Sequence, residues 1–317
     1  MRVSKNWVKF NKMFTLSPWV DETEALTQAI SLARNNHAVL KALVVCPDFP
    51  KQMKDYRGKY EASLKEQLAQ VIQTTRDILK VNEGDVPVQI EVESGDTPSI
   101  RIIRHVLKHS HDLVVKATDP KEGGKGFKAI DMELLRKCPC PIWLTRPIHR
   151  HRNTMRVAVA IDPKSTAPEG RDLSLNLLTL SRSLADTCSG ELNVLSCWDY
   201  EFEDYLRQNV WIKVSDDELT KSIDAAQNEH KAAQVHLLKE SGIQGNLQIH
   251  HIRGQAEQII PQYVADHQID ILVMGTVART GISGFFIGNT AENVVQKLEC
   301  SLLALKPNGF VSPVMAY

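Results

Sequence analysis

The chain has 317 residues, of which 43% are hydrophobic and 24% are charged, as in an ordinary globular protein. Lys and Arg together number 38, as do Asp and Glu, so the formal net charge is zero and a broad nucleic-acid surface is not expected. No apolar run reaches the ~20 residues that a membrane helix needs. The N-terminus lacks the apolar core of a secretory signal, so a cytoplasmic protein is predicted.

The first half of the chain alternates apolar strand patterns with amphipathic helix patterns. Strands are predicted at residues 11–18, 38–47 and 86–95, with a long helix at 60–80. A helix then leads into an apolar strand that ends at residue 117, and a further helix and strand occupy 132–147. This alternation predicts a parallel sheet covered by helices.

The second half repeats the pattern more clearly. Strands are predicted at 156–162, 191–198, 247–254, 270–275 and 301–307, and helices at 173–188, 217–242, 256–268 and 290–300. Gly242 is the predicted C-cap of the longest helix. Residues 199–218 mix aromatic and acidic side chains, which predicts an irregular lid or a short helix, or else a cover for a ligand or a partner surface.

The two halves resemble each other in sequence. Residues 94–117 and 253–276 share a glycine, a helix pattern and an apolar strand entered through Asp112 or Asp270. This repeat predicts a duplicated α/β domain, with domains at 1–148 and 149–317, because the polar segment 146–155 lacks periodicity. Such domains pack as an intramolecular pseudo-dimer, and the closing strands at 142–145 and 302–305 are expected near the contact. Association of two chains into a homodimer stays open.

A glycine-rich loop follows the strand at 270–275 and leads to a helix. It contains Gly275, Gly281, Gly284 and Gly288. A loop between a parallel strand and a helix N-terminus suits phosphate, because free backbone N–H groups and the helix dipole attract anions. The alternative is that the glycines only form turns and that Asn289 begins a capping box, which needs no ligand.

Four segments resemble tandem members of the universal stress protein family. They are GTVARTGIS and GNTAENVV in the second half, and HDLVVKA and LLRKCPCPIW in the first. The resemblance covers nearly the whole chain. It implies two five-stranded parallel-sheet domains of the adenine-nucleotide alpha-hydrolase-like, Rossmann-like type.

The resemblance also implies a nucleotide site in the second domain. Gly275 and Gly288 match two glycines of the family's phosphate loop, whereas Ala278 stands where the family has another glycine. An aspartate that ends the first strand contacts ribose in the family, and a residue of the second strand contacts adenine through its backbone. The candidate nucleotide-binding residues are Asp162, Cys197, Gly275, Thr276, Ala278, Arg279, Gly288, Asn289 and Thr290.

The corresponding loop of the first domain departs from the family pattern. Gly123, Gly124 and Gly126 do not have the family spacing, and Ser17-Pro18 stands where the second domain has Asp162-Pro163. We expect that this domain has no ATP site and serves packing, partner contact or a different ligand.

Together these features predict a cytoplasmic stress-response protein that binds ATP or a related nucleotide in its second domain. The alternative is a non-catalytic interaction protein with vestigial nucleotide sites that acts through unknown protein partners. A slow ATPase is a third reading, but no catalytic residue is predicted, because neither a P-loop nor a nucleophile elbow occurs.

Histidines and cysteines were considered as metal ligands. The pairs His109/His111, His149/His151 and His250/His251 have no third ligand at a useful spacing, so no metal site is predicted. The six cysteines lie mostly in or beside apolar runs and are expected to be buried, reduced thiols, with Cys138 and Cys140 as an alternative redox or metal pair.

Overall fold

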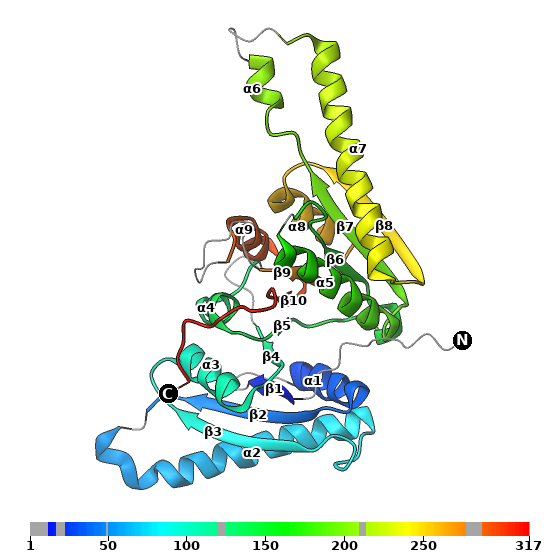
Figure 1. Ribbon diagram of the computed structural model, residues 1–317. Helices are drawn as coiled ribbons and strands as arrows, with labels where there is room; N and C mark the ends of the chain where they lie inside the picture. Colours follow the sequence, from blue (N-terminus) through cyan, green and yellow to red (C-terminus); the bar gives the residue numbers. More distant parts are fainter. Residues whose placement is uncertain are drawn as a thin grey trace.

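The computed structural model describes residues 12–16, 23–48, 50–118, 125–165, 167–208, 214–276 and 287–316. The strands of this part form one ten-stranded sheet in the order β3-β2-β1-β4-β5-β10-β9-β6-β7-β8 (Figure 1). The first five positions belong to the first half of the chain and the last five to the second half. The prediction of two five-stranded α/β domains is therefore confirmed.

The elements of the first domain alternate along the chain as expected for a parallel sheet. Its strands are β1 (Lys12–Leu16), β2 (Val39–Cys46), β3 (Val88–Ser94), β4 (Leu113–Ala117) and β5 (Ile142–Thr145). Its α-helices are α1 (Thr23–Asn36), α2 (Arg57–Leu79), α3 (Pro98–His109) and α4 (Ala129–Lys137), and a short 3₁₀ helix spans Lys51–Tyr56. A second 3₁₀ helix, Arg152–Thr154, lies in the segment that leads into the second domain.

The second domain follows the same order. Its strands are β6 (Val157–Ala160), β7 (Glu191–Trp198), β8 (Asn246–Arg253), β9 (Ile271–Gly275) and β10 (Ser301–Leu305). Its helices are α5 (Pro168–Asp186), α6 (Glu203–Gln208), α7 (Asp216–Ser241), α8 (Ala256–Asp266) and α9 (Asn289–Lys297). Gly242 caps α7 with a φ of 62°, which confirms the predicted C-cap.

The two domains join edge to edge through their last strands. Within each domain the paired strands run parallel, but β5 and β10 pair antiparallel, with Leu302 opposite Leu144 and Ala304 opposite Ile142. These side chains are buried. The predicted position of the closing strands at the domain contact is confirmed, and the pseudo-dimer shares one continuous sheet.

Helices cover both faces of this sheet, and each face has a core that runs through both domains (Figure 1). One core contains side chains of α3, α4, α8 and α9, such as Ile103, Leu134, Ile260 and Val294. The other contains side chains of α1, α5 and α7, such as Ile30 and Leu178. Burial on two faces explains why the central strands read as continuous apolar runs.

No helix in the part of the chain that the structure describes is both long and apolar enough to cross a bilayer.

Candidate nucleotide site

The strand order reverses between β6 and β9, and the sheet edge at this reversal is called the crevice below. The chain runs from β6 to β7 and β8 on one side of β6, and then returns to β9 and β10 on the other side. Open parallel sheets bind ligands at such a reversal, outside the carboxyl ends of the strands. Ala160 of β6 pairs with Met274 of β9 and Leu195 of β7. Two residues later, Asp162 therefore lies level with Thr276 and Cys197.

Asp162 is held by the turn and the helix that follow it. The backbone N–H of Lys164 donates to its Oδ1 at 3.2 Å, and the Ser174 hydroxyl of α5 donates to its backbone oxygen at 3.3 Å. The side chain is half-buried at the sheet edge. This position suits a carboxylate that accepts hydrogen bonds from ribose hydroxyls.

The two ends of the glycine-rich loop meet beside Asp162. Thr276 is buried and its N–H donates to Leu305 at 3.1 Å, while the N–H of Gly288 donates to the backbone oxygen of Thr276 at 3.2 Å. Residues 277–286 of this loop, including Ala278, Arg279, Gly281 and Gly284, lie outside the described residues. The described ends fix where the loop leaves and returns to the sheet.

Packing alone accounts for one of the two matched glycines. A Cβ on Gly275 would lie 2.8 Å from Cδ2 of Leu173 on α5, so this strand end packs closely against that helix. Gly288 has a φ of −61° and a ψ of 143°, a conformation open to most residues. Neither backbone conformation by itself requires a bound phosphate.

The N-terminus of α9 has no side-chain cap. The N-cap residue is Gly288, and Asn289 is already the first helical residue, so the capping box interpretation of Asn289 was wrong. Asn289 and Thr290 are exposed in the first turn. Within the described part of the chain, no side chain accepts from the N–H groups of this first helical turn.

Cys197 lies at this edge, near the end of β7. Burial raises the pKa of its thiol to about 12, so the group stays protonated and is a poor nucleophile. Its half-buried side chain packs against the core of α8 and α9. All six cysteines are free thiols, and four are buried, namely Cys46, Cys138, Cys140 and Cys300.

The first domain has a carboxylate at the N-terminus of α4, where the second domain has an alanine at the N-terminus of α9. Asp131, the third residue of α4, is 1% exposed, and its Oδ2 accepts from the Lys128 N–H at 3.2 Å and from the Thr118 hydroxyl at 2.5 Å. Its Oδ1 lies 2.9 Å from Nζ of Lys116 on β4. The third residue of α9 is Ala291. An internal carboxylate thus occupies the anion position of the first domain.

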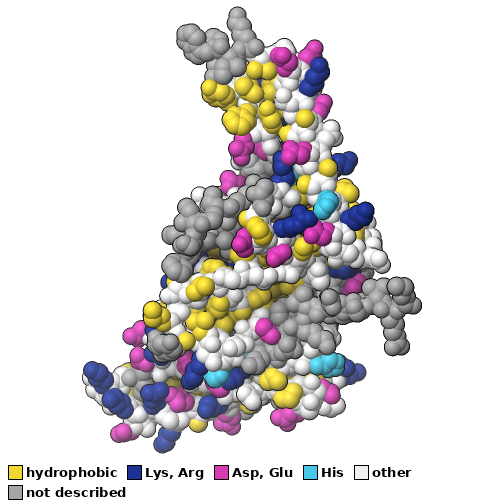
Figure 2. Space-filling view, viewed as in Figure 1, with side chains coloured by type: hydrophobic (Ala, Val, Ile, Leu, Met, Phe, Trp, Pro, Cys, Tyr) yellow, Lys and Arg dark blue, Asp and Glu magenta, His cyan; other side chains and the backbone are white. Residues whose placement is uncertain are grey.

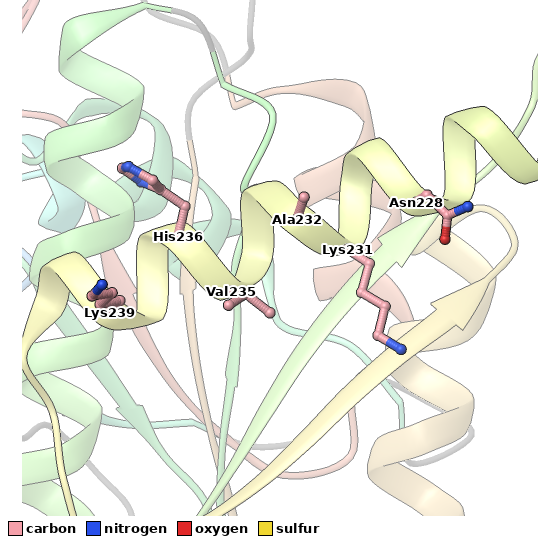
Figure 3. Close-up of a pocket in the computed structure, with 6 residues that line it drawn as sticks. All are labelled: Asn228, Lys231, Ala232, Val235, His236 and Lys239. Atoms are coloured by element: carbon pink, nitrogen blue, oxygen red, sulfur yellow. The ribbon is translucent and has the colours of Figure 1, made fainter.

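Two surface hollows are lined by described residues of the second domain. One, of about 400 Å³, is lined by Trp198, Glu203, Asp224, Arg253 and neighbouring side chains of β7, β8, α6 and α7. The other is a shallow strip on α7, and Figure 3 shows that its six side chains all come from this one helix. Because one helix supplies no opposing wall, this strip is not a candidate site.

The segment between β7 and α7 contains the predicted short helix, α6. Phe202 and Tyr205 at this helix are 62% and 55% exposed. Figure 2 shows hydrophobic side chains at this projecting end of the molecule. Whether they cover a ligand or a partner remains a prediction.

The first domain contains a histidine cluster that was not predicted from the sequence. His105 and His109 lie one turn apart on α3, and Glu91 of β3 faces them, so that their three ligand-type atoms lie within 4.8 Å of one another. His105 Nε2 lies 2.8 Å from Glu91 Oε2. The signal was the i, i+4 spacing of His105 and His109, which adjacent pairs such as His109/His111 obscured.

The pKa shifts of Glu91 and His109 determine the charges of this cluster near neutral pH. Burial opposes ionisation of Glu91, but hydrogen bonds from Lys41 and His105 outweigh it and lower the pKa of Glu91 to about 2. Burial and the neighbouring His105 lower the pKa of His109. Near pH 7, Glu91 is therefore charged and His109 is mostly neutral.

The family follows from comparison of the whole chain with known proteins. The model of the Universal stress protein family matches residues 20–146 and again residues 154–306. The chain belongs to the universal stress protein family. Universal stress protein E of Escherichia coli (strain K12) is 29% identical over 311 residues, which cover 96% of each chain. Universal stress protein E of Photorhabdus laumondii is 28% identical over 96% of this chain and 98% of that relative.

Solved structures share the fold of this chain over nearly its whole length. A functionally unknown protein from Pseudomonas aeruginosa PAO1 superposes with a TM-score of 0.71 and 24% identity, over 95% of this chain and 94% of that one. A universal stress protein from Archaeoglobus fulgidus gives a TM-score of 0.60 and 14% identity, over 93% and 98%. At these identities the likeness establishes the fold.

Proposed function

We propose that the second domain binds ATP or a related nucleotide in the crevice between β6 and β9. Asp162 accepts hydrogen bonds from the ribose, and the backbone at Cys197 contacts the base. The phosphates lie at the loop that begins at Gly275 and Thr276, against the N-terminus of α9 at Gly288, Asn289 and Thr290. Ala278 and Arg279 complete this set as predictions.

The observation that carries this proposal is the contrast between Asp131 and Ala291. In the first domain a buried carboxylate accepts from the N-terminus of α4 and pairs with Lys116. In the second domain the same helix position is Ala291, and no described side chain caps α9. Because the free N–H groups and the dipole of a helix N-terminus favour an anion, a phosphate bound here would take the place that the carboxylate has in the first domain.

The same contrast supports a different role for the first domain. A phosphate placed beside Asp131 would meet a negative charge in a buried position, which costs several kcal/mol. We therefore infer that the first domain does not bind ATP at the equivalent place and that it packs, contacts partners or holds another ligand.

In this proposal the protein binds its nucleotide as a stress-related ligand-binding protein rather than turning it over rapidly. Cys197, the thiol at the site, stays protonated. The expected location in the cytoplasm and the absence of fast ATP hydrolysis remain predictions. Phosphate release measured over hours would test the slow ATPase reading.

The test is nucleotide content followed by titration. Protein purified without added nucleotide is denatured, and the released small molecules are identified by mass spectrometry. ATP is then titrated into the stripped protein, Asp162→Ala, Ala291→Asp and the control Asp172→Ala, whose side chain is exposed on α5. We expect at least about 10-fold weaker binding in the first two variants and no change in the control.

The reasons for these expectations differ. Asp162→Ala removes the acceptor for the ribose hydroxyls. Ala291→Asp places a carboxylate in the first turn of α9, where it repels the phosphates, in the position that Asp131 has in α4. Failure of the wild type to bind ATP at millimolar concentration would overturn the proposal and favour the interaction protein with vestigial sites. Equal affinities in all variants would move the nucleotide to another place.

A further inference from the structure

The cluster of Glu91, His105 and His109 combines buried and accessible groups. His105 is 2% exposed, whereas the Glu91 side chain on edge strand β3 is 40% exposed. Two nitrogen donors and one carboxylate oxygen thus meet at a place that solvent reaches from one side. Their ligand-type atoms lie within 4.8 Å of one another.

We propose that Glu91, His105 and His109 bind a Zn²⁺ ion in the first domain. Two imidazoles and one carboxylate are a ligand set that Zn²⁺ accepts in tetrahedral sites, with water as the fourth ligand. This site is separate from the nucleotide crevice of the second domain. Its existence does not depend on nucleotide binding.

The Glu91–His105 pair needs only a small adjustment to admit the metal, whereas the separations that involve His109 are at most 4.8 Å and shorten by up to about 1.5 Å. His105 Nε2 and Glu91 Oε2 are 2.8 Å apart and share a proton. Two ligands of a tetrahedral Zn²⁺ at about 2.0–2.1 Å are about 3.3 Å apart, so the pair opens by a few tenths of an ångström. The metal replaces the shared proton.

His111 lies where it can accept a hydrogen bond from the ring nitrogen of His105 that does not bind the metal. Its Nε2 lies 3.3 Å from Nδ1 of His105, and the two rings stack with centroids 5.2 Å apart. When the metal takes Nε2, the neutral His105 ring carries its proton on Nδ1 and donates it to His111. The stacking of the two rings holds His105 in this orientation without metal.

Lys41 limits the affinity of the site. Its Nζ lies 2.5 Å from Oε1 of Glu91, which orients the carboxylate but adds a positive charge next to the metal. Removal of this charge without loss of a ligand strengthens metal binding. A merely structural role of the cluster would not produce a gain of this kind.

The second domain provides an internal control. Counted from the glycine after the strand and the aspartate before the next strand, Glu91, His105 and His109 correspond to His250, Tyr263 and His267. The Tyr263 hydroxyl lies 2.8 Å from His250 Nε2, and burial raises the pKa of Tyr263 to about 12. A neutral phenol in place of His105 leaves this cluster without the zinc ligand set.

The test is Zn²⁺ titration of the untagged full chain after chelator treatment, in competition with a chromophoric chelator near neutral pH. We expect one equivalent bound, with affinity at least about 100-fold weaker in His109→Ala and about 10-fold weaker in Glu91→Gln. Lys41→Gln binds about 10-fold more tightly, and His267→Ala binds as the wild type does. Co²⁺ absorption reports nitrogen and oxygen ligands only.

Three results would overturn the proposal. The first is that the wild type does not bind Zn²⁺ up to about 0.1 mM. The second is that His109→Ala and Glu91→Gln bind Zn²⁺ with the affinity of the wild type. The third is that the Co²⁺ spectrum contains sulfur charge-transfer bands. Glu91→Gln keeps the shape of a half-exposed side chain, so it reports on the metal even if His109→Ala lowers stability.

Discussion

The third residue of α4 is the buried Asp131, whereas the third residue of α9 is Ala291. Lys116 and Thr118 in the first domain likewise correspond to Met274 and Thr276 in the second. The backbone order is the same, but the first domain has a buried carboxylate at this helix N-terminus, whereas the second has an alanine and no described side-chain cap. Duplication therefore preserved the fold while the chemistry of the two crevices diverged.

The largest effect on stability is expected from removing Asp131, the buried carboxylate of the first domain. Asp131→Ala leaves the Lys116 ammonium, whose side chain is 14% exposed, without its carboxylate and should lower the free energy of unfolding by about 4 kcal/mol. Chemical denaturation measures the loss. The double variant Lys116→Met/Asp131→Ala copies the second domain and should recover most of it. A loss below about 1 kcal/mol in Asp131→Ala would contradict the comparison.

A second difference lies at the residues that follow the seam strands, Arg146 and Lys306. Burial lowers the pKa of Lys306 to about 8, below its unfolded value near 10.5. Between these values the unfolded chain binds more protons, so stability should rise with pH from about 8 to 10.5, by about 3 kcal/mol. Arg146 remains protonated over this range and should add no such dependence.

The control for this pH dependence is Lys306→Met, compared with the wild type by unfolding at several pH values. The rise should disappear in the variant, because no group at position 306 titrates. Parallel pH profiles for the two proteins would show that the Lys306 ammonium is solvated, despite its contacts with Thr276 and the Phe310 ring.

The smallest effect concerns the ends of β4 and β9, which are Ala117 and Gly275. A Cβ at Gly275 meets the end of the flexible Leu173 side chain, so Gly275→Ala should cost only about 1 kcal/mol of stability. Thermal unfolding measures this cost, with Ala117→Gly as the matched change in the first domain. A larger loss of ATP affinity than of stability would show that the glycine serves the ligand as well as packing.

Periodicity allowed most of the fold to be predicted before the structure was known. Apolar runs such as residues 191–198 and 270–275 are strands buried on both faces, and the repeat placed the closing strands at the seam. The prediction of a capping box at Asn289 was wrong, because the pattern of side chains does not show at which residue the helix begins. Gly288 takes that position.

The candidate sites were harder to predict because they depend on contacts between distant residues. Glu91 lies 14 residues before His105, and only the packing of α3 on β3 brings the two within 2.8 Å. The role of Asp131 was missed for the same reason, since its partner Lys116 is on another element. A buried carboxylate and an exposed one look alike in a sequence.

The sequence by itself determined the family, the two α/β domains and the position of a loop suited to phosphate, because local periodicity and glycine spacing encode these features. The tertiary structure decided which helix N-terminus contains a buried, paired carboxylate and which histidines lie close to Glu91. It also decided that the antiparallel pairing of β5 with β10 joins the two sheets into one. Those outcomes depend on which side chains are desolvated together, and desolvation is a property of the packed chain.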